Sequence, residues 1–241
     1  MMRLPARLTT ELAKVRIAQI FSSARENSLV HCVDPSGILH PGAAAPVSRE
    51  KMQELITHRA PVVWVGGSEP LHHPGVGHFV RAVARGGHFV FLETDGTLLR
   101  RRIHEFQPLP QLFLTMRLRS FEDSPFAVEG LRAAKLSGFF TVVHSPVHDE
   151  ADLAQLSPLR ALLMKNDVDG WLITAGSSEG AIGRKTAEAR MLIPSSFWRQ
   201  FSAVVGEALL SQTQEREGKR AEASPTETPH PEAHEEGVGT A

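Results

Sequence analysis

The sequence predicts an α/β fold in which six parallel strands form a partial (βα)6 barrel. Six short runs rich in Val, Phe and Ile alternate with segments whose apolar residues recur every three or four positions. Strands that are apolar on both faces and are separated by amphipathic helices are typical of a parallel sheet with helical crossovers. The predicted strands are residues 28–34, 62–66, 88–93, 111–116, 139–144 and 170–174.

Amphipathic segments precede, separate and follow these strands. An N-terminal helix is expected after Pro5, where Leu8, Leu12 and Val15 share one face. The sets with helical spacing between the strands are Met52/Leu55/Ile56, Val76/Phe79/Val80/Val83, Val128/Leu131 and Leu159/Leu162/Leu163. Pro158 predicts a kink or a restart in the last of them. A final helix is expected near residues 196–210, docked on the outside or the end of the barrel.

Composition divides the chain into three segments and limits its partners. Residues 1–27 form a helical arm, residues 28–211 the (βα)6 domain, and residues 212–241, rich in Glu, Pro, Thr, Ser, Gly and His, a tail expected to be disordered. The formal net charge of −1 argues against a nucleic acid or an acidic membrane as the main partner. Polar residues interrupt every apolar run, so no membrane span is expected. The single cysteine indicates a reducing compartment, and a cytoplasmic location is therefore expected.

Binding residues are expected in the loops after the strands, because the carboxyl ends of the strands converge in parallel βα folds. The loop after residues 62–66 is the most distinctive. It reads Gly66-Gly67-Ser68-Glu69-Pro70, followed by Leu71 and His73-Pro74. Glycines let the backbone approach a ligand, and carbonyls and a carboxylate suit an ammonium group. A glycine-rich turn with Pro74 at the first position of a helix is the structural alternative.

This loop resembles the Gly-Gly-Glu-Pro loop of the radical S-adenosylmethionine (radical SAM) family, with Ser68 where that loop usually has a glycine. Residues 89–96 resemble the third strand of the family, which ends in a Thr-Asn-Gly-like turn, with Asp95 in place of the Asn. Residues 127–142 resemble its fourth helix and fifth strand, and residues 168–174 its sixth strand. Among subgroups, the adenosyl-hopene-transferase-like set, which carries a helix before the first strand, is the most similar.

The resemblance implies a SAM-binding site at the carboxyl ends of the strands. In the family, the Gly-Gly-Glu-Pro loop holds the amino group of the methionine moiety, and groups at the end of the fourth strand contact SAM. Arg117 stands at that strand end and is expected to grip a carboxylate. The expected cofactor-binding residues are Gly66, Gly67, Ser68, Glu69, Pro70, Thr94, Asp95, Arg117, His144 and Thr174.

The loop after the first strand departs from the family. The family places three cysteines there, spaced Cys-x3-Cys-x2-Cys, and their thiolates hold a [4Fe–4S] cluster. Residues 36–46 contain no cysteine, and Cys32, the only cysteine of the chain, lies within the predicted strand as a small apolar residue. One thiolate cannot hold the cluster, and His31 and His40 are poor substitutes for two more. The [4Fe–4S] cluster is therefore predicted to be absent.

Two functions are compatible with a chain that has the SAM-binding loop pattern but lacks the cluster cysteines. The first is a catalytically impaired radical-SAM-like protein, a pseudoenzyme that binds SAM or a related small molecule or serves as the partner of an active enzyme. The second is an active SAM-dependent enzyme: a radical SAM transferase whose cluster ligands come from a partner chain, or an enzyme that uses SAM without radical chemistry. Glu69, Asp95 and Arg117 are compatible with this second function.

Two glycine-containing stretches near the C-terminus predict no second catalytic site. Gly176-Ser177-Ser178-Glu179-Gly180 follows a strand, as a hydrolase nucleophile elbow does, but no Asp comes after it and the later histidines lie in the tail. Residues 183–186 lack the spacing of a phosphate-binding loop and are expected to form a solvated loop.

Histidines and arginines near the strand ends were weighed as further sites. His144, His148, Asp149 and Glu150 form the densest group of metal-ligand types, but Pro146 breaks their helical spacing, so no metal site is predicted. Arg100, Arg101 and Arg102 are expected on the outer face of a helix, and either Arg117 or Arg119 to point into the cleft.

Overall fold

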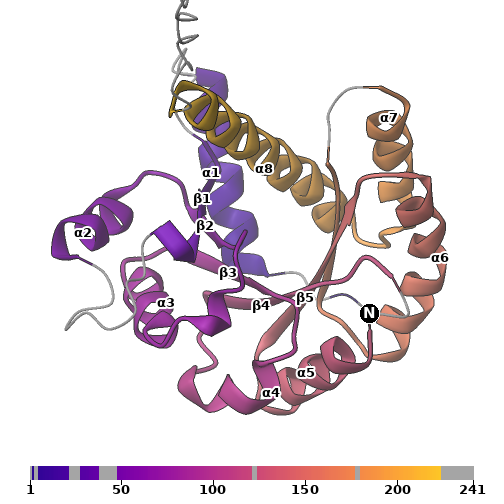
Figure 1. Ribbon diagram of the computed structural model, residues 1–241, viewed down its shortest axis with the longest axis horizontal. Coiled ribbons are helices and arrows are strands. Elements are labelled where there is room, and N and C mark those ends of the chain that lie inside the picture. Colours follow the sequence, from indigo (N-terminus) through magenta and orange to yellow (C-terminus); the bar gives the residue numbers. More distant parts are fainter. Residues whose placement is uncertain are drawn as a thin grey trace, which may run out of the picture.

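The six predicted strands form one parallel sheet in chain order, which confirms the predicted half-barrel (Figure 1). The computed structural model describes Met2 and residues 5–21, 28–37, 48–120, 124–176 and 180–223. The strands are β1 (Val30–Val33), β2 (Val62–Val65), β3 (Phe89–Thr94), β4 (Leu112–Arg117), β5 (Phe140–Val147) and β6 (Gly170–Ala175). From β2 to β6 they are buried almost throughout, as expected for a sheet covered on both faces.

Helices connect the strands and cover the outer face of the sheet (Figure 1). They are α1 (Ala6–Phe21), α2 (Arg49–Thr57), α3 (Val76–Arg85), α4 (Leu99–Arg102), α5 (Ser124–Leu136), α6 (Glu150–Lys165), α7 (Gly180–Ala189) and α8 (Ser196–Ala223), with single turns at Pro35–Gly37, Pro70–His72, Ile103–Glu105 and Arg190–Leu192. Ser48 caps α2 by accepting from the N–H of Lys51, and Asp149 caps α6 through the N–H of Asp152. No helix within the described ranges is long and apolar enough to cross a bilayer.

Three helices differ from the sequence prediction. α6 passes through Pro158 without a restart, since the cap at Asp149 begins the helix well ahead of the proline. Residues 183–186 lie in α7 and not in a loop. The inward face of this helix consists of Ile182, Thr186 and Ala189, which is too weakly apolar a pattern to have predicted a helix. α8 runs past residue 210 to Ala223, because residues 211–223 are rich in good helix formers. Residues 224–241 of the predicted tail lie outside the described residues.

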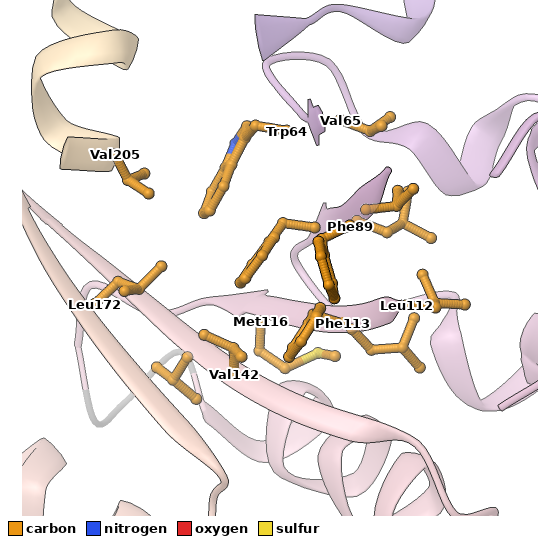
Figure 2. Packing of buried hydrophobic residues seen from close by; sticks show 14 of the residues in the cluster. Trp64, Val65, Phe89, Leu112, Phe113, Met116, Val142, Leu172 and Val205 are labelled. Carbon is orange, nitrogen blue, oxygen red and sulfur yellow. The ribbon is translucent and has the colours of Figure 1, made fainter. Parts of the chain in front are cut away.

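An aromatic stack fills the concave side of the half-barrel. Trp64, Phe91 and Phe113 stand at the same level of β2, β3 and β4, with neighbouring ring centroids 5.8 Å and 4.5 Å apart. Phe201 of α8 packs on Phe91 with a centroid separation of 5.1 Å. Figure 2 shows Val205 of the same helix beside Trp64. Side chains therefore fill the inside of the half-barrel at the level of this aromatic stack. A ligand-binding site is expected beyond this core, at the carboxyl ends of the strands.

Helix α8 lies across the open side of the half-barrel, where it packs on both edge strands, β1 and β6. The hydroxyl of Ser202 accepts from the N–H of Ile173 at 3.1 Å, and the guanidinium of Arg190 donates to the carbonyl of the same residue at 3.1 Å. A Cβ on Gly170 would lie 2.5 Å from the ring of Trp198, so only glycine admits this tryptophan against β6. The side chains of Ser202 and Arg190 thus provide hydrogen-bond partners at the outer edge of β6, where a seventh strand would otherwise pair.

Candidate functional site

The loop after β2 requires its two glycines. The N–H of Gly66 donates to the carbonyl of Val33 at 3.0 Å and so extends the pairing of β2 with β1 by one residue. A Cβ on Gly66 would lie 2.5 Å from a carboxylate oxygen of Glu93 and 2.9 Å from the indole nitrogen of Trp64. Gly67 adopts a φ of 100°, which residues with a side chain rarely adopt. The loop can lie this close to the strand-end side chains because neither position carries a side chain.

Glu69 joins this loop to the end of β3. Its Oε1 accepts from the N–H of Leu71 at 3.0 Å and from the hydroxyl of Thr94 at 2.8 Å, and its Oε2 accepts from the N–H of Asp95 at 2.9 Å. The structure therefore brings Glu69 together with Thr94 and Asp95, which lie 25 and 26 positions further along the sequence. Pro70 follows as the buried first residue of a single helical turn. The carboxylate of Glu69 therefore also holds the loop against β3, a structural role that the sequence pattern did not predict.

Ser68, the departure from the glycine-rich pattern, joins the loop to the segment after β1. Its hydroxyl donates to the carboxylate of Asp34 at 2.6 Å. The same carboxylate oxygen accepts from the N–H of Ser36 at 3.0 Å and from its hydroxyl at 2.8 Å. The ends of β1, β2 and β3 are thus linked by the side chains of Asp34, Ser68 and Glu69.

A chain of buried polar side chains lies beneath the loop. The carboxylate of Glu93 on β3 accepts from Nδ1 of His144 on β5 at 2.5 Å, and Nε2 of His144 lies 2.7 Å from the hydroxyl of Thr174 on β6. The indole N–H of Trp64 donates to the second oxygen of Glu93 at 3.3 Å. Glu93, His144 and Thr174 are each at most 5% exposed. The structure therefore places the predicted residues His144 and Thr174 in direct contact and joins His144 to Glu93, which the sequence pattern did not single out.

Arg117 ends β4 next to this chain. Burial alone would raise the pKa of Glu93, but the charge and hydrogen bond of His144, the charge of Arg117 and the hydrogen bond of Trp64 together lower the pKa below its ordinary value. Glu93 is therefore a carboxylate at neutral pH. The guanidinium of Arg117 is half-buried and has no hydrogen-bond partner among the described residues. It can therefore bind the carboxylate or phosphate of a ligand without giving up a bond.

The four residues weighed as metal ligands point to different partners. His144 belongs to the buried chain, His148 contacts Asp152 with a ring nitrogen 3.4 Å from the carboxylate, Asp149 caps α6, and Glu150 pairs with Lys185 at 2.6 Å. Across the described ranges, no three His, Cys, Asp or Glu side chains are placed to hold a metal ion.

Arg119 and Arg102 are engaged in structural contacts. Arg119 forms a bidentate ion pair with Asp152, with both nitrogen–oxygen distances at 3.0 Å. Of the two arginines expected near the cleft, Arg119 is therefore already paired. Arg102 was expected on the outer face of a helix. Instead it is half-buried, pairs with Glu105, and donates to the carbonyls of Leu71 and His73. It holds the turn after Pro70 in place by adding side-chain donors to two carbonyls of that segment, of which the carbonyl of His73 also accepts from the N–H of Val76.

The donor set does not fit a [4Fe–4S] cluster. Cys32 lies in β1, half-buried and packed against the apolar core, and the chain has no second thiol. Three thiolates are the usual cluster ligands in a site of this kind. Residues 38–47, where the alanine-rich loop lies, and residues 177–179 of the Gly-x-Ser-x-Gly stretch are outside the described residues. The absence of the cluster therefore stays a prediction from the sequence.

Two cavities lie away from the strand ends. One of about 180 Å³ separates α1 from α8 and is lined by Leu12 and Phe201, among others. The other, of about 430 Å³, lies between β1 and the second half of α8 and is lined by His31, Cys32 and His58, among others. Neither is lined by a predicted cofactor-binding residue. The chemistry at the strand ends, rather than cavity size, identifies the candidate site.

Comparisons with known proteins support the fold. No family model matches the sequence, and no curated protein matches it. SuiB from Streptococcus suis bound to S-adenosylmethionine aligns with a TM-score of 0.51 at 12% identity, over 69% of this chain and 46% of SuiB. SuiB bound to the precursor peptide SuiA aligns with a TM-score of 0.53 at 12% identity, over 87% of this chain and 50% of SuiB.

Archaeal TYW1 aligns with a TM-score of 0.38 at 17% identity, over 51% of this chain and 45% of TYW1. The chain therefore spans about half the length of the solved proteins it is similar to. The likeness to SuiB shows that the chain has the half-barrel fold that the sequence resemblance implies.

Proposed function

We propose that the protein binds S-adenosylmethionine, or a closely related adenosyl amino acid, at the carboxyl ends of β2 to β6, and that it performs no radical chemistry by itself. The observation that carries the proposal is the convergence of opposite charges at this end of the sheet. Glu69 and Asp95 supply carboxylates, and Arg117 supplies a guanidinium without a hydrogen-bond partner among the described residues. SAM carries an ammonium, a carboxylate and a sulfonium, so a site with both signs of charge suits it.

In this proposal, the protein's own groups bind and orient the ligand. The glycine loop brings backbone close to the ammonium, and Arg117 pairs with the ligand carboxylate. Glu69 positions the loop because its three hydrogen bonds hold it against β3. Glu93, which is hydrogen-bonded to His144, lies against Gly66 and forms the floor beneath the loop. The chain's single thiolate supports a role without a resident [4Fe–4S] cluster, so no step is routed through one.

A polypeptide partner is the second part of the proposal. SuiB, which has the same fold, is known in a complex with the precursor peptide SuiA. A chain that binds SAM but cannot hold a cluster would act through a partner protein that presents a substrate or supplies the missing thiolates. An active enzyme assembled in that way remains the alternative. An assay of activity with and without the partner distinguishes the impaired protein from the enzyme assembled with a partner.

Calorimetry with SAM tests the ligand. The wild-type chain should release binding heat with SAM, and Arg117→Ala should weaken the affinity by at least about tenfold, because a charge-assisted hydrogen bond is lost. Arg100→Ala is the matched control: Arg100 is exposed and pairs with Glu129 on α5, away from the site. No binding heat for the wild-type chain, or equal affinity of the Arg117 and Arg100 variants, would contradict the proposal.

Anaerobic reconstitution with iron and sulfide tests the cluster. The isolated chain should bind no stoichiometric [4Fe–4S] cluster, as measured by iron and sulfide content and by charge-transfer absorbance. Cys32→Ala should behave in the same way as the wild-type chain. A stoichiometric cluster in the isolated wild-type chain would refute the impaired role and leave the SAM-binding result standing.

A further inference from the structure

An exposed histidine lies against a buried carboxylate in the loop after β5. His148 follows the last residue of β5, and its side chain is 53% exposed. Its Nδ1 lies 3.4 Å from Oδ2 of Asp152, whose side chain is 8% exposed, and its backbone N–H donates to the same oxygen at 2.8 Å. Nε2 of His148 has no partner among the described residues. One nitrogen of the ring is therefore directed at a carboxylate and the other is open.

Arg119 keeps Asp152 in its charged form. The guanidinium donates to both carboxylate oxygens, each at 3.0 Å. Burial alone would raise the pKa of Asp152, but the hydrogen bonds and charge of Arg119, with the hydrogen bonds of His148, lower the pKa below its ordinary value. An ionised carboxylate has no proton to donate, so the nitrogen of His148 that faces it carries the ring proton. The lone pair of the neutral ring is therefore at Nε2.

A glycine after β6 makes room for this ring. The N–H of Gly176 donates to the carbonyl of Val147 at 2.7 Å and continues the pairing of β6 with β5. A Cβ on Gly176 would lie 2.6 Å from Cδ2 of His148. Residues two apart along a strand share a face, so this Cβ would point to the concave side, as Thr174 does. The ring of His148 therefore lies on the concave side, nearer the open end of the half-barrel than the buried His144.

We propose that His148 and Asp152 form a proton-accepting pair for a substrate that reacts at the open end of the half-barrel. Nε2 of His148 takes the proton of a hydroxyl, thiol or amine group, so that the oxygen, sulfur or nitrogen can attack an electrophile. Asp152 is a positioning residue, because it orients the ring and stabilises the positive charge that the ring gains.

This inference goes beyond the proposed function and does not depend on it. The pair lies at the end of the sheet where SAM is proposed to bind. When the methyl group of SAM is the electrophile, the attacking atom gains the methyl, the sulfur leaves with the electron pair of its bond to carbon, and His148 holds the released proton. The test below uses no SAM, so a failure of SAM binding and a failure of the proton-accepting pair are separate results.

Hydrolysis of p-nitrophenyl acetate tests the pair, with water as the attacking hydroxyl and the absorbance of p-nitrophenolate as the measurement. His148→Gln should lower the rate at neutral pH by at least about tenfold, because an amide cannot accept the proton. His78→Gln is the matched control: His78 is also an exposed histidine close to a carboxylate, that of Glu105, but it lies on α3. Equal rates for the wild-type chain and both variants would overturn the proposal.

The solvent isotope effect separates proton transfer from a structural role. Wild-type hydrolysis should be slower in heavy water, since a proton moves as water attacks; equal rates in both solvents would overturn the proposal. Asp152→Asn should lower the rate and lose this slowing, because an amide can donate to Nδ1 and leave the ring proton on Nε2. A partly folded sample would keep the isotope effect of its folded fraction, so a wild-type isotope effect in Asp152→Asn would refute the positioning role. If that variant does not fold, His148→Gln decides.

Discussion

The hydroxyl of Ser68 donates to the carboxylate of Asp34 at 2.6 Å and ties the loop after β2 to the end of β1. Asp34 also receives the N–H and the hydroxyl of Ser36, so one carboxylate organises the first turn after β1. A glycine at position 68 could not make this contact. The serine therefore supplies a direct side-chain link between the segments that follow β1 and β2.

Ser68→Ala should lower the free energy of unfolding by about 1 kcal/mol, because the Asp34 carboxylate loses one donor while keeping two. Urea unfolding followed by tryptophan fluorescence gives this value. Ser211→Ala is the control, since that exposed hydroxyl bonds only to a carbonyl of its own helix. An equal loss in both variants would show that the link between the loops contributes nothing.

Glu93→Gln should destabilise the protein by about 3 kcal/mol, since it removes the charge from a buried pair and leaves His144 with a weaker partner. Glu129→Gln is the matched control, because Glu129 pairs with Arg100 at the surface and should cost at most about 0.5 kcal/mol. Chemical denaturation at neutral pH compares the two. Similar midpoints for both variants would mean that the buried chain carries no net stabilisation.

Stability should fall as the pH decreases from about 6.5 towards 4. The pKa of His31 is lowered from 6.5 to about 4 by burial and neighbouring charge, so between these values the unfolded chain binds the proton more strongly than the folded chain does. His31→Phe keeps a ring stacked on His58 and should flatten this part of the profile of urea midpoint against pH. His72→Gln, an exposed histidine, should leave it unchanged.

The buried carboxylate of Glu93 should affect stability at a lower pH than His31 does. The pKa of Glu93 is below its ordinary value of 4.5, so its contribution to stability is complete above that value and is lost as the pH falls through the lowered pKa. His31→Phe should therefore leave an acid-induced loss below pH 4.5, and Glu93→Gln should reduce it. A wild-type midpoint that stays constant from pH 7 to pH 4 would contradict the role of His31.

Gly170→Ala should disrupt the docking of α8, because the new methyl group would lie 2.5 Å from the ring of Trp198. Overpacking of this kind costs about 1–3 kcal/mol. Gly206→Ala is the control within α8: its methyl would meet atoms at 3.5 Å or more, and alanine favours a helix over glycine. Thermal unfolding should show a lower Tm for Gly170→Ala and an unchanged or higher Tm for Gly206→Ala.

The sheet was predictable from the sequence because each strand is a continuous apolar run. Every run proved to be a strand, with ends shifted by a few residues. The hydrogen bonds from Thr94 and Asp95 to Glu69 were not predicted from the loop pattern. α7 was not predictable in that way. Its inward face carries Ile182, Thr186 and Ala189, which is too weak an apolar stripe to distinguish a helix from a loop.

Glu93 was missed for a physical reason as well. It sits inside the apolar run of β3, and nothing nearby in the sequence shows which face it occupies or what it meets there. Its partner His144 is 51 positions away on β5, and only the parallel register brings the two side chains to the same face. An acid within a buried strand, two strands from a buried histidine, is the signal that would have found the pair.

Because α8 covers both β1 and β6, the half-barrel is completed by the last helix of the described chain. During synthesis, the outer edges of β1 and β6 remain exposed until residues near Trp198 and Ser202 have left the ribosome. The contacts between β1 and α8 span most of the sequence, which favours slow closure. A nascent chain halted before α8 would expose two strand edges and the aromatic stack, the features that make incompletely folded chains prone to aggregate.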